Sequence, residues 1–302
     1  MGNKGDAIGR FELALSYLNG EDKSMVNALK WLAKAFEVVE GNGTMDALRT
    51  RFSETKGQHG EFDCEFEKCI KSYEYMKDAD LLRESDKAKA FEAYKKAAEI
   101  GNAEAQNWVG KYYLYGWGDC EKDHDKAMEW FRKSAEQMFA SGVYNVGLCY
   151  DEGYGVQKDE REAMKWYTKA AQQGLPLGQF ELGQHYRKGR GVEKDPEEAV
   201  RWYEKAAEQG QEDAMGLLGD CYYHGWGVEE DNDEAVKWYR RASEHNNRGA
   251  MYMLGNCYEK GHGVNKDWNL ARKWYKEAAD KGHEKAKEAL ESLESRSKSS
   301  RW

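Results

Sequence analysis

The residues best suited to metal binding are two groups of histidine and cysteine. His59, Cys64 and Cys69 follow one another at intervals of five residues, and Cys120 precedes His124 by four. Structural zinc sites use two close pairs of ligands, and no second pair accompanies either group. The sequence therefore predicts no metal site and no cofactor.

Glycine pairs separated by one residue recur along the chain, as in Gly189-x-Gly191 and Gly225-x-Gly227. A phosphate-binding loop would follow a strand and continue into Lys-Ser or Lys-Thr, whereas these pairs end predicted helices. Neither a nucleophile elbow nor a zincin helix occurs. The many carboxylates stand at predicted helix starts, where the helix dipole favours them. We therefore expect a protein that is not an enzyme.

Basic side chains recur on one face of successive predicted helices, two and six residues after a recurring alanine. The candidates for partner binding are Lys133, Lys165, Lys169, Arg201, Lys205, Lys237, Arg241 and Lys273. In a chain of net charge −9, such a face is expected to bind an acidic peptide or a carboxylate terminus. The alternative is a solvated helix face, because Glu198 and Arg201 have the spacing of an intrahelical ion pair.

The residue between two loop glycines is a second candidate for partner binding. It is Trp117 in one copy and Trp226 in another. Tryptophan is favoured as an anchor in protein interfaces. The alternative is that these rings pack on the helix of a neighbouring repeat.

These positions recur because the chain is built from repeats of 36 residues. The tryptophans that mark the period are Trp130, Trp166, Trp202, Trp238 and Trp274. Each lies on a helical stripe of alanines and aromatics, such as Ala199, Trp202 and Tyr203. A second stripe follows, with Leu218 and Gly219 as examples. Each repeat is therefore a pair of helices that buries its stripes by stacking on neighbouring pairs.

The combined pattern is A-x-x-W-Y-x-K-A-A-x-x-G followed by A-x-x-x-L-G-x-x-Y-x-x-G-x-G-V-x-x-D. It resembles the Sel-one-like repeat (SLR) family, a relative of the tetratricopeptide repeats, over residues 87–285. Met138 and Asn246 depart from it at a cap glycine, and Ser243 at an alanine. The resemblance implies an all-α, right-handed superhelical solenoid of antiparallel helix pairs. It also implies that the tryptophan-bearing helices line the inner, concave surface.

The regular period does not cover the whole chain. We expect divergent helical repeats over 1–86, with a helix over 61–78 and an inserted, partly helical connection at about 41–60. Five regular repeats follow over 87–267, then a capping helix pair over 268–295 and a mobile tail over 296–302. In the first segment, Ala28, Trp31 and Leu32 have the spacing of a helix that ends near Gly41.

Composition narrows the compartment and the partner. No run of 18 apolar residues occurs, so no membrane span is expected, and the acidic balance argues against nucleic-acid binding. Cys149, Cys221 and Cys257 occupy one register of different repeats, too far apart for disulfides. They are expected to be small buried residues of a protein in the cytoplasm.

We expect a scaffold or adaptor that binds a partner protein or peptide on the curved surface of a solenoid. Two other functions stay open. One is an inhibitor, an immunity-type protein or a regulatory subunit that controls a specific enzyme. The other is an enzyme whose site lies within 41–86, the least repeat-like region.

Overall fold

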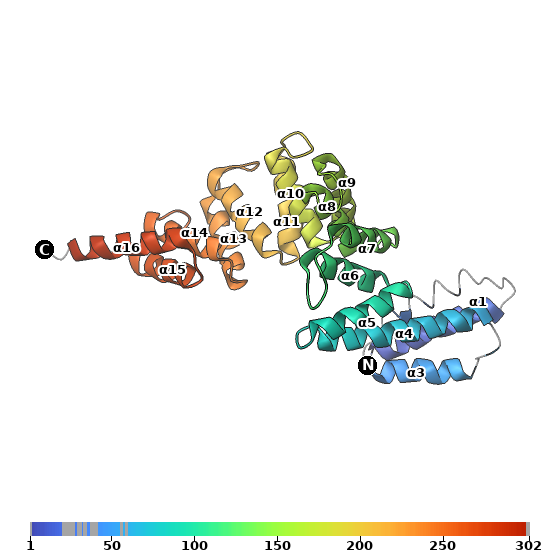
Figure 1. Ribbon diagram of the computed structural model, residues 1–302. Helices are drawn as coiled ribbons and strands as arrows, with labels where there is room; N and C mark the ends of the chain where they lie inside the picture. Colours follow the sequence, from blue (N-terminus) through green and yellow to red (C-terminus); the bar gives the residue numbers. More distant parts are fainter. Residues whose placement is uncertain are drawn as a thin grey trace. The chain divides into compact units, whose positions relative to one another are not determined.

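The computed structural model describes residues 2–19, 28, 32, 35–36, 42–54, 57 and 60–299. These residues form fifteen helices and no strand, which confirms the predicted all-α class (Figure 1). The helices belong to two compact units that divide after Lys122. This division lies beyond residue 86, where the sequence placed the start of the regular repeats.

The first unit has a core of phenylalanine rings. Its helices are α1 (Gly2–Asn19), α3 (Asn42–Ser53), α4 (Gly60–Leu82), α5 (Lys87–Glu99) and α6 (Ala103–Tyr115). The Phe66 ring stacks on Phe52 with centroids 4.0 Å apart, and the Phe11 ring lies 5.1 Å from Phe66. The helix expected at 61–78 is present as α4, and α3 lies in the segment where the sequence placed an insertion.

The helix expected around Trp31 falls largely on residues outside those described. Of its positions, Ala28, Leu32 and Ala35 are helical and buried, as the spacing of its apolar residues predicts. Trp31 and Gly41 lie outside the described residues.

The second unit is a row of helices in which each one packs against the next (Figure 1). Its helices are α7 (His124–Glu136), α8 (Ala140–Glu152), α9 (Glu160–Gln172), α10 (Pro176–Lys188), α11 (Pro196–Glu208), α12 (Glu212–His224), α13 (Asn232–Glu244), α14 (Arg248–Lys260), α15 (Trp268–Asp280) and α16 (Glu284–Ser299). We call α7, α9, α11, α13 and α15 the tryptophan helices. We call α8, α10, α12 and α14 the glycine helices.

Tyrosine rings packed on glycines hold this row together. Tyr239 of α13 is fully buried, and its ring lies directly on Gly219 of α12. A Cβ atom at Gly219 would be 2.6 Å from the Tyr239 ring, far inside van der Waals contact. The same pairing recurs at Gly147, Gly183 and Gly255. Small residues on the glycine helices therefore let each following tryptophan helix approach closely.

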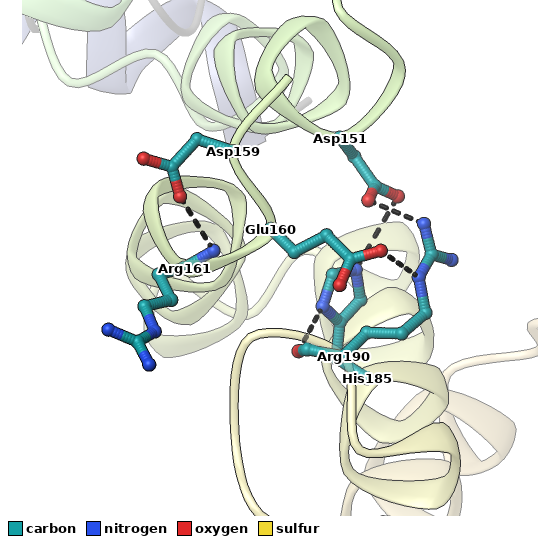
Figure 2. Close-up of polar contacts among 6 residues, drawn as sticks. All are labelled: Asp151, Asp159, Glu160, Arg161, His185 and Arg190. Atoms are coloured by element: carbon teal, nitrogen blue, oxygen red, sulfur yellow. Dashed lines mark hydrogen bonds and ion pairs between the residues drawn. The ribbon is translucent and has the colours of Figure 1, made fainter. Parts of the chain in front are cut away.

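Aspartates begin the tryptophan helices. Asp159 accepts a 2.9 Å hydrogen bond from the backbone N–H of Arg161 (Figure 2) and a 3.0 Å bond from that of Glu162, the contacts of a helix N-cap. Equivalent caps are made by Asp123, Asp195, Asp231 and Asp267. The aspartate that follows each Gly-x-Gly-Val segment thus fixes where the next helix starts.

The loop before each cap folds back on the preceding tryptophan helix. A Cβ atom at Gly191 would lie 2.3 Å from the carbonyl oxygen of Glu160, the first residue of α9. No side chain fits there. The residue between the two loop glycines, Arg190 in this copy, is consequently held beside the start of that helix.

The tryptophan helices end in a left-handed residue, and two copies use a residue other than glycine. Met138 (φ 59°) and Asn246 (φ 66°) are the non-glycine residues with positive φ in the described part of the chain. Both positions were identified from the sequence as departures from the cap glycine. A side chain with a Cβ is strained in this conformation, and asparagine tolerates it better than methionine does.

We predict that Met138→Gly raises the free energy of unfolding by about 1 kcal/mol, because it removes the left-handed strain. The Met138 side chain is 63% exposed, so little packing is lost. Chemical denaturation of the wild type and the variant measures the difference. Asn246→Gly should give a smaller gain, and an equal or negative change at Met138 would contradict the assignment of strain.

Candidate binding site

The eight predicted basic residues are exposed on the tryptophan helices and contact side chains of their own helix. Lys165, Arg201 and Lys237 lie 2.7, 2.9 and 2.6 Å from glutamates three residues earlier. The cations six residues after the recurring alanine lie 3.9–4.4 Å from the ring centroid of the tryptophan three residues earlier; they are Lys133, Lys169, Lys205 and Arg241. Lys273 lies 3.9 Å from Glu277. Cation–π contacts and short-range ion pairs thus account for these residue types.

The two predicted loop tryptophans have different surroundings. Trp117 is half-buried, with its ring stacked on Tyr115 at 4.9 Å between centroids. Trp226 is 50% exposed and stacks on His224 at 4.7 Å. Trp226 therefore offers the more accessible aromatic surface.

A hollow of about 420 Å³ lies on the glycine helices α10, α12 and α14, with residues at the start of α16 at one end. Phe180, Leu217 and Tyr252 are among its apolar lining residues. None of the eight predicted basic residues lines it. The sequence places the inner, concave surface on the tryptophan helices, and this stays a prediction. Glycine helices α12 and α14 contact each other directly beside the hollow.

The hollow exists because one copy lacks an aromatic ring. Three residues before the packing glycine, three glycine helices carry Tyr144, Phe180 and Tyr252. Each of these rings lies 5.6–6.0 Å from the buried tyrosine of the following helix. In α12 the same position is Gly216, whose added Cβ would meet nothing closer than 3.5 Å. The side of Tyr239 that another copy would cover therefore faces the hollow.

Two acidic residues, Asp213 and Asp220, line the hollow. The Asp220 carboxylate accepts a 2.7 Å hydrogen bond from the Tyr239 hydroxyl. Burial raises the pKa of Asp220, although the hydrogen bond from Tyr239 and the nearby His224 and Arg187 lower it. The lining therefore combines aromatic and polar side chains.

A second cluster lies where the loop after α10 meets α8 and α9 (Figure 2). The Arg190 guanidinium, at a quarter exposed, donates to the carboxylate of Asp151 (2.6 Å) and to that of Glu160 (3.2 Å). Nδ1 of the fully buried His185 lies 2.9 Å from the Arg190 carbonyl oxygen, which can only accept, so this nitrogen donates. Nε2 of His185 is 3.5 Å from Asp151. The cluster joins three elements and two successive repeats.

The charges of this cluster favour an ionised Asp151. Burial raises the pKa of the Asp151 carboxyl, but the hydrogen bond and charge of His185 together with the charge of Arg190 outweigh it, and the pKa falls below its ordinary value. The hydroxyl of Tyr167, whose ring lies 5.3 Å from His185, has no hydrogen-bond partner in the described structure.

The described residues do not form the arrangements that metal sites and membrane spans require. Within the described residues, no three His, Cys, Asp or Glu side chains are placed to hold a metal ion. Helices long and apolar enough to cross a bilayer are likewise absent from the described part of the chain. Cys149, Cys221 and Cys257 are buried, unpaired thiols as predicted, and burial raises the pKa of each to about 12.

Comparison with known proteins decides the family. The sequence model of the Sel1 repeat matches residues 7–37, 72–102, 103–137, 140–175, 176–211, 212–247 and 249–283. The chain belongs to the Sel1 repeat family. Sel1 repeat proteins generally mediate protein–protein interaction, and the fold is typically a non-catalytic scaffold.

Solved structures agree with the fold. A Sel1 repeat protein from Oxalobacter formigenes is 34% identical, covers 72% of this chain and 89% of its own, and superposes with a TM-score of 0.68. A protective antigen of uropathogenic Escherichia coli with an SLR fold is 29% identical over 97% of this chain and 65% of that one (TM-score 0.52). An immunity protein from Pseudomonas aeruginosa is 24% identical over 69% and 81% (TM-score 0.50). A comparison with curated protein sequences finds no match.

The matched units give the order of the two helices within a repeat. A unit such as 176–211 begins with glycine helix α10 and ends with tryptophan helix α11. The glycine helix is thus the first helix of a Sel1 repeat, whereas the sequence pattern puts it second. The two helix types keep their order along the chain, but the pairing shifts by one helix.

Sequence reasoning missed the cluster at Asp151, Arg190 and His185. One signal was present, because His185 occupies the register of Cys149 and Cys221. A charged or hydrogen-bonding residue in a position otherwise occupied by a buried thiol needs a partner. The carboxylate partner of His185, Asp151, lies in another repeat, so the 36-residue period alone does not reveal it.

Two glycines of α12 should respond oppositely to alanine. Gly216→Ala adds a Cβ at ordinary van der Waals distance from Asn247 and removes a glycine from a helix, so the free energy of unfolding should rise by about 0.5–1 kcal/mol. Gly219→Ala pushes a Cβ against the Tyr239 ring and should lower it by roughly 1–3 kcal/mol. Urea denaturation of both variants tests this, and similar effects at the two positions would contradict the packing described.

Breaking the second cluster should destabilise the protein in a pH-dependent way. We expect Asp151→Asn to lower the free energy of unfolding by about 3 kcal/mol. This is near the low end of the cost of breaking a buried ion pair, because Arg190 is partly exposed. Since the folded-state pKa of Asp151 is lowered, its contribution is complete above the unfolded-state pKa of about 4 and is lost as pH falls through the folded value.

Denaturation of wild type and Asp151→Asn between neutral and acidic pH measures this difference. The matched control is Glu234→Gln, which breaks the exposed pair with Lys237 and should cost under about 1 kcal/mol. A difference between wild type and Asp151→Asn that grows as pH falls would refute the electrostatic account.

Proposed function

We propose that the protein is a scaffold or adaptor that binds a partner protein through the hollow on α10, α12 and α14. The observation that carries this proposal is the missing ring at Gly216. Each flanking glycine helix covers the next buried tyrosine with its own aromatic ring, as Phe180 and Tyr252 do. Tyr239 has no such ring beside it and lines a hollow of about 420 Å³, although its own side chain is fully buried.

The chemistry of the hollow favours a large aromatic or apolar side chain from the partner. Phe180, Leu217, Tyr252 and Met253 supply apolar walls, so an inserted ring would be removed from water on several sides. Buried aromatic contacts of this kind dominate the energy of protein interfaces. Asp220 and Asn247 at the rim and floor can accept or donate hydrogen bonds that orient the inserted group.

The lining positions also differ between copies, unlike the residues that hold the stack. At the position one residue after the packing glycine, the four glycine helices carry Leu148, Gln184, Asp220 and Asn256. Variation on a rigid, repeated framework provides a surface specific to one partner. We also propose, from its buried free thiols, that the protein works in the reducing cytoplasm.

An inhibitor or immunity-type role would use the same surface with a single enzyme or toxin as partner. The immunity-protein neighbour supports the shared fold and adds nothing on the partner. The stoichiometry of the purified complex separates the two functions. One enzyme bound with full loss of its activity would favour the inhibitor, and several partners or an active bound partner would favour the scaffold.

Filling the hollow tests the proposal. Gly216→Tyr supplies the ring that the other copies carry, and the free space around Gly216 lets the variant fold. In affinity capture followed by mass spectrometry, we expect the wild type to retain a partner that Gly216→Tyr loses by about tenfold or more.

The matched control is Arg201→Tyr, which places the same ring on the exposed face of α11. This variant should capture the partner as the wild type does. If Gly216→Tyr folds, as judged by circular dichroism, and still captures the same proteins at wild-type levels, the hollow is not the binding surface.

A further inference from the structure

A second pocket, of about 320 Å³, opens at the ends of α10 and α12 against the start of α11. Arg187, Lys188 and Lys194 contribute basic side chains to its lining, and Trp226 contributes an aromatic one. Pro196, Tyr203 and Cys221 complete the apolar side. The pocket is separate from the hollow at Gly216, with which it shares no lining residue.

The other repeats show what normally occupies this position. The last turn of one glycine helix is bonded to the loop residue 39 positions later. Asp151 holds Arg190 at 2.6 Å, and the Tyr223 hydroxyl lies 2.8 Å from Nδ1 of His262. The intervening copy has Arg187 and Trp226 at these two places, and no hydrogen bond joins them in the described structure.

The charge in the open copy is the reverse of that in the closed one. Where Asp151 offers a carboxylate to Arg190, the equivalent residue Arg187 is a cation that contacts only Gln184 of its own helix by hydrogen bond. Neither Lys188 nor Lys194 forms an ion pair within the described residues. Three cations thus border a pocket that holds no carboxylate of its own.

A buried polar atom also lacks a partner here. The Tyr203 side chain is fully buried, and its hydroxyl has no hydrogen-bond partner among the described residues. Arg187 is near enough to lower the pKa of this hydroxyl, although burial raises it further. Arg187 also lowers the pKa of the Asp220 carboxyl, which is hydrogen-bonded to Tyr239 and lines the other hollow.

We propose that this pocket binds an aspartate or glutamate side chain of a partner protein, with the carboxylate on Arg187 and the partner's backbone beside Trp226. The partner's carboxylate would pair with Arg187 as the Asp151 carboxylate pairs with Arg190 in the preceding copy, with the two charges exchanged in position. Arginine suits the task because its planar guanidinium can donate two parallel hydrogen bonds to one carboxylate. Lys188 and Lys194 add attraction that draws an acidic segment toward the pocket.

The site differs from the acidic-peptide surface predicted from the sequence. The basic residues of the tryptophan helices, such as Arg201, are already engaged within their own helix. Trp226 belongs to both the site predicted from the sequence and the pocket proposed here. Arg187, Lys188 and Lys194 belong to the pocket alone. The proposal does not depend on what fills the hollow at Gly216.

The test uses a short fluorescein-labelled peptide of glutamates with an amidated C-terminus and the full-length protein. Fluorescence polarisation should show binding that weakens as salt is added and that Arg187→Gln reduces by about tenfold or more. Arg201→Gln removes the same charge from the outer face and should bind as the wild type does. Equal affinity of the Arg187→Gln variant and wild type would overturn the proposal.

A double exchange distinguishes loss of peptide binding from loss of folding. Arg187→Asp with Trp226→Arg installs the ion pair of the preceding copy, which should close the pocket, keep the thermal stability and abolish peptide binding. Retained binding by this folded variant would contradict the proposal. Two further ligands identify the source of the charge, a peptide with a free C-terminus and inorganic phosphate. Binding that requires the free C-terminus, or binding of phosphate alone, would refute recognition of an acidic side chain.

Discussion

The packing of a tyrosine ring on a glycine is the contact on which the second unit depends. Tyr239 on Gly219 brings α13 against α12 at a distance that even one additional methyl group would prevent. The same contact sets the spacing of the other repeats and requires the small residues around it. The most regular positions of the sequence contribute little to partner specificity, because their side chains are buried in contacts between helices.

Specificity then falls to positions that the packing leaves unconstrained. The α10–α12 region departs from its neighbours twice, at Gly216 and at the pair Arg187 and Trp226. In both places another copy supplies a group from within the chain, a ring in one case and a carboxylate in the other. A partner that provides both groups would complete this repeat, and the rest of the array would serve as a rigid frame for it.

Much of the fold could be predicted from the sequence. The 36-residue period, the aspartate caps and the left-handed residues at Met138 and Asn246 follow from local chemistry, and the structure has them where expected. The hollow beside Gly216 could not be predicted, because a helical stripe tells which face of a helix is buried and not where neighbouring helices leave space. In the sequence, Gly216 is only a residue of low helix propensity. Its importance depends on the aromatic rings at the same position of the neighbouring repeats, which the structure places in space. The Asp151–Arg190 pair spans two repeats at a spacing of 39, which the period itself does not mark.

The central claim is that the partner lies on the glycine helices α10, α12 and α14, at the hollow beside Gly216. Site-specific photo-crosslinking measures this directly, with p-benzoylphenylalanine placed in turn at Leu217 and Met253 in the hollow and at Lys165 and Lys237 on the tryptophan helices. The account predicts a covalent adduct with one partner from the first two positions and none from the other two. An adduct formed only from Lys165 or Lys237 would contradict it.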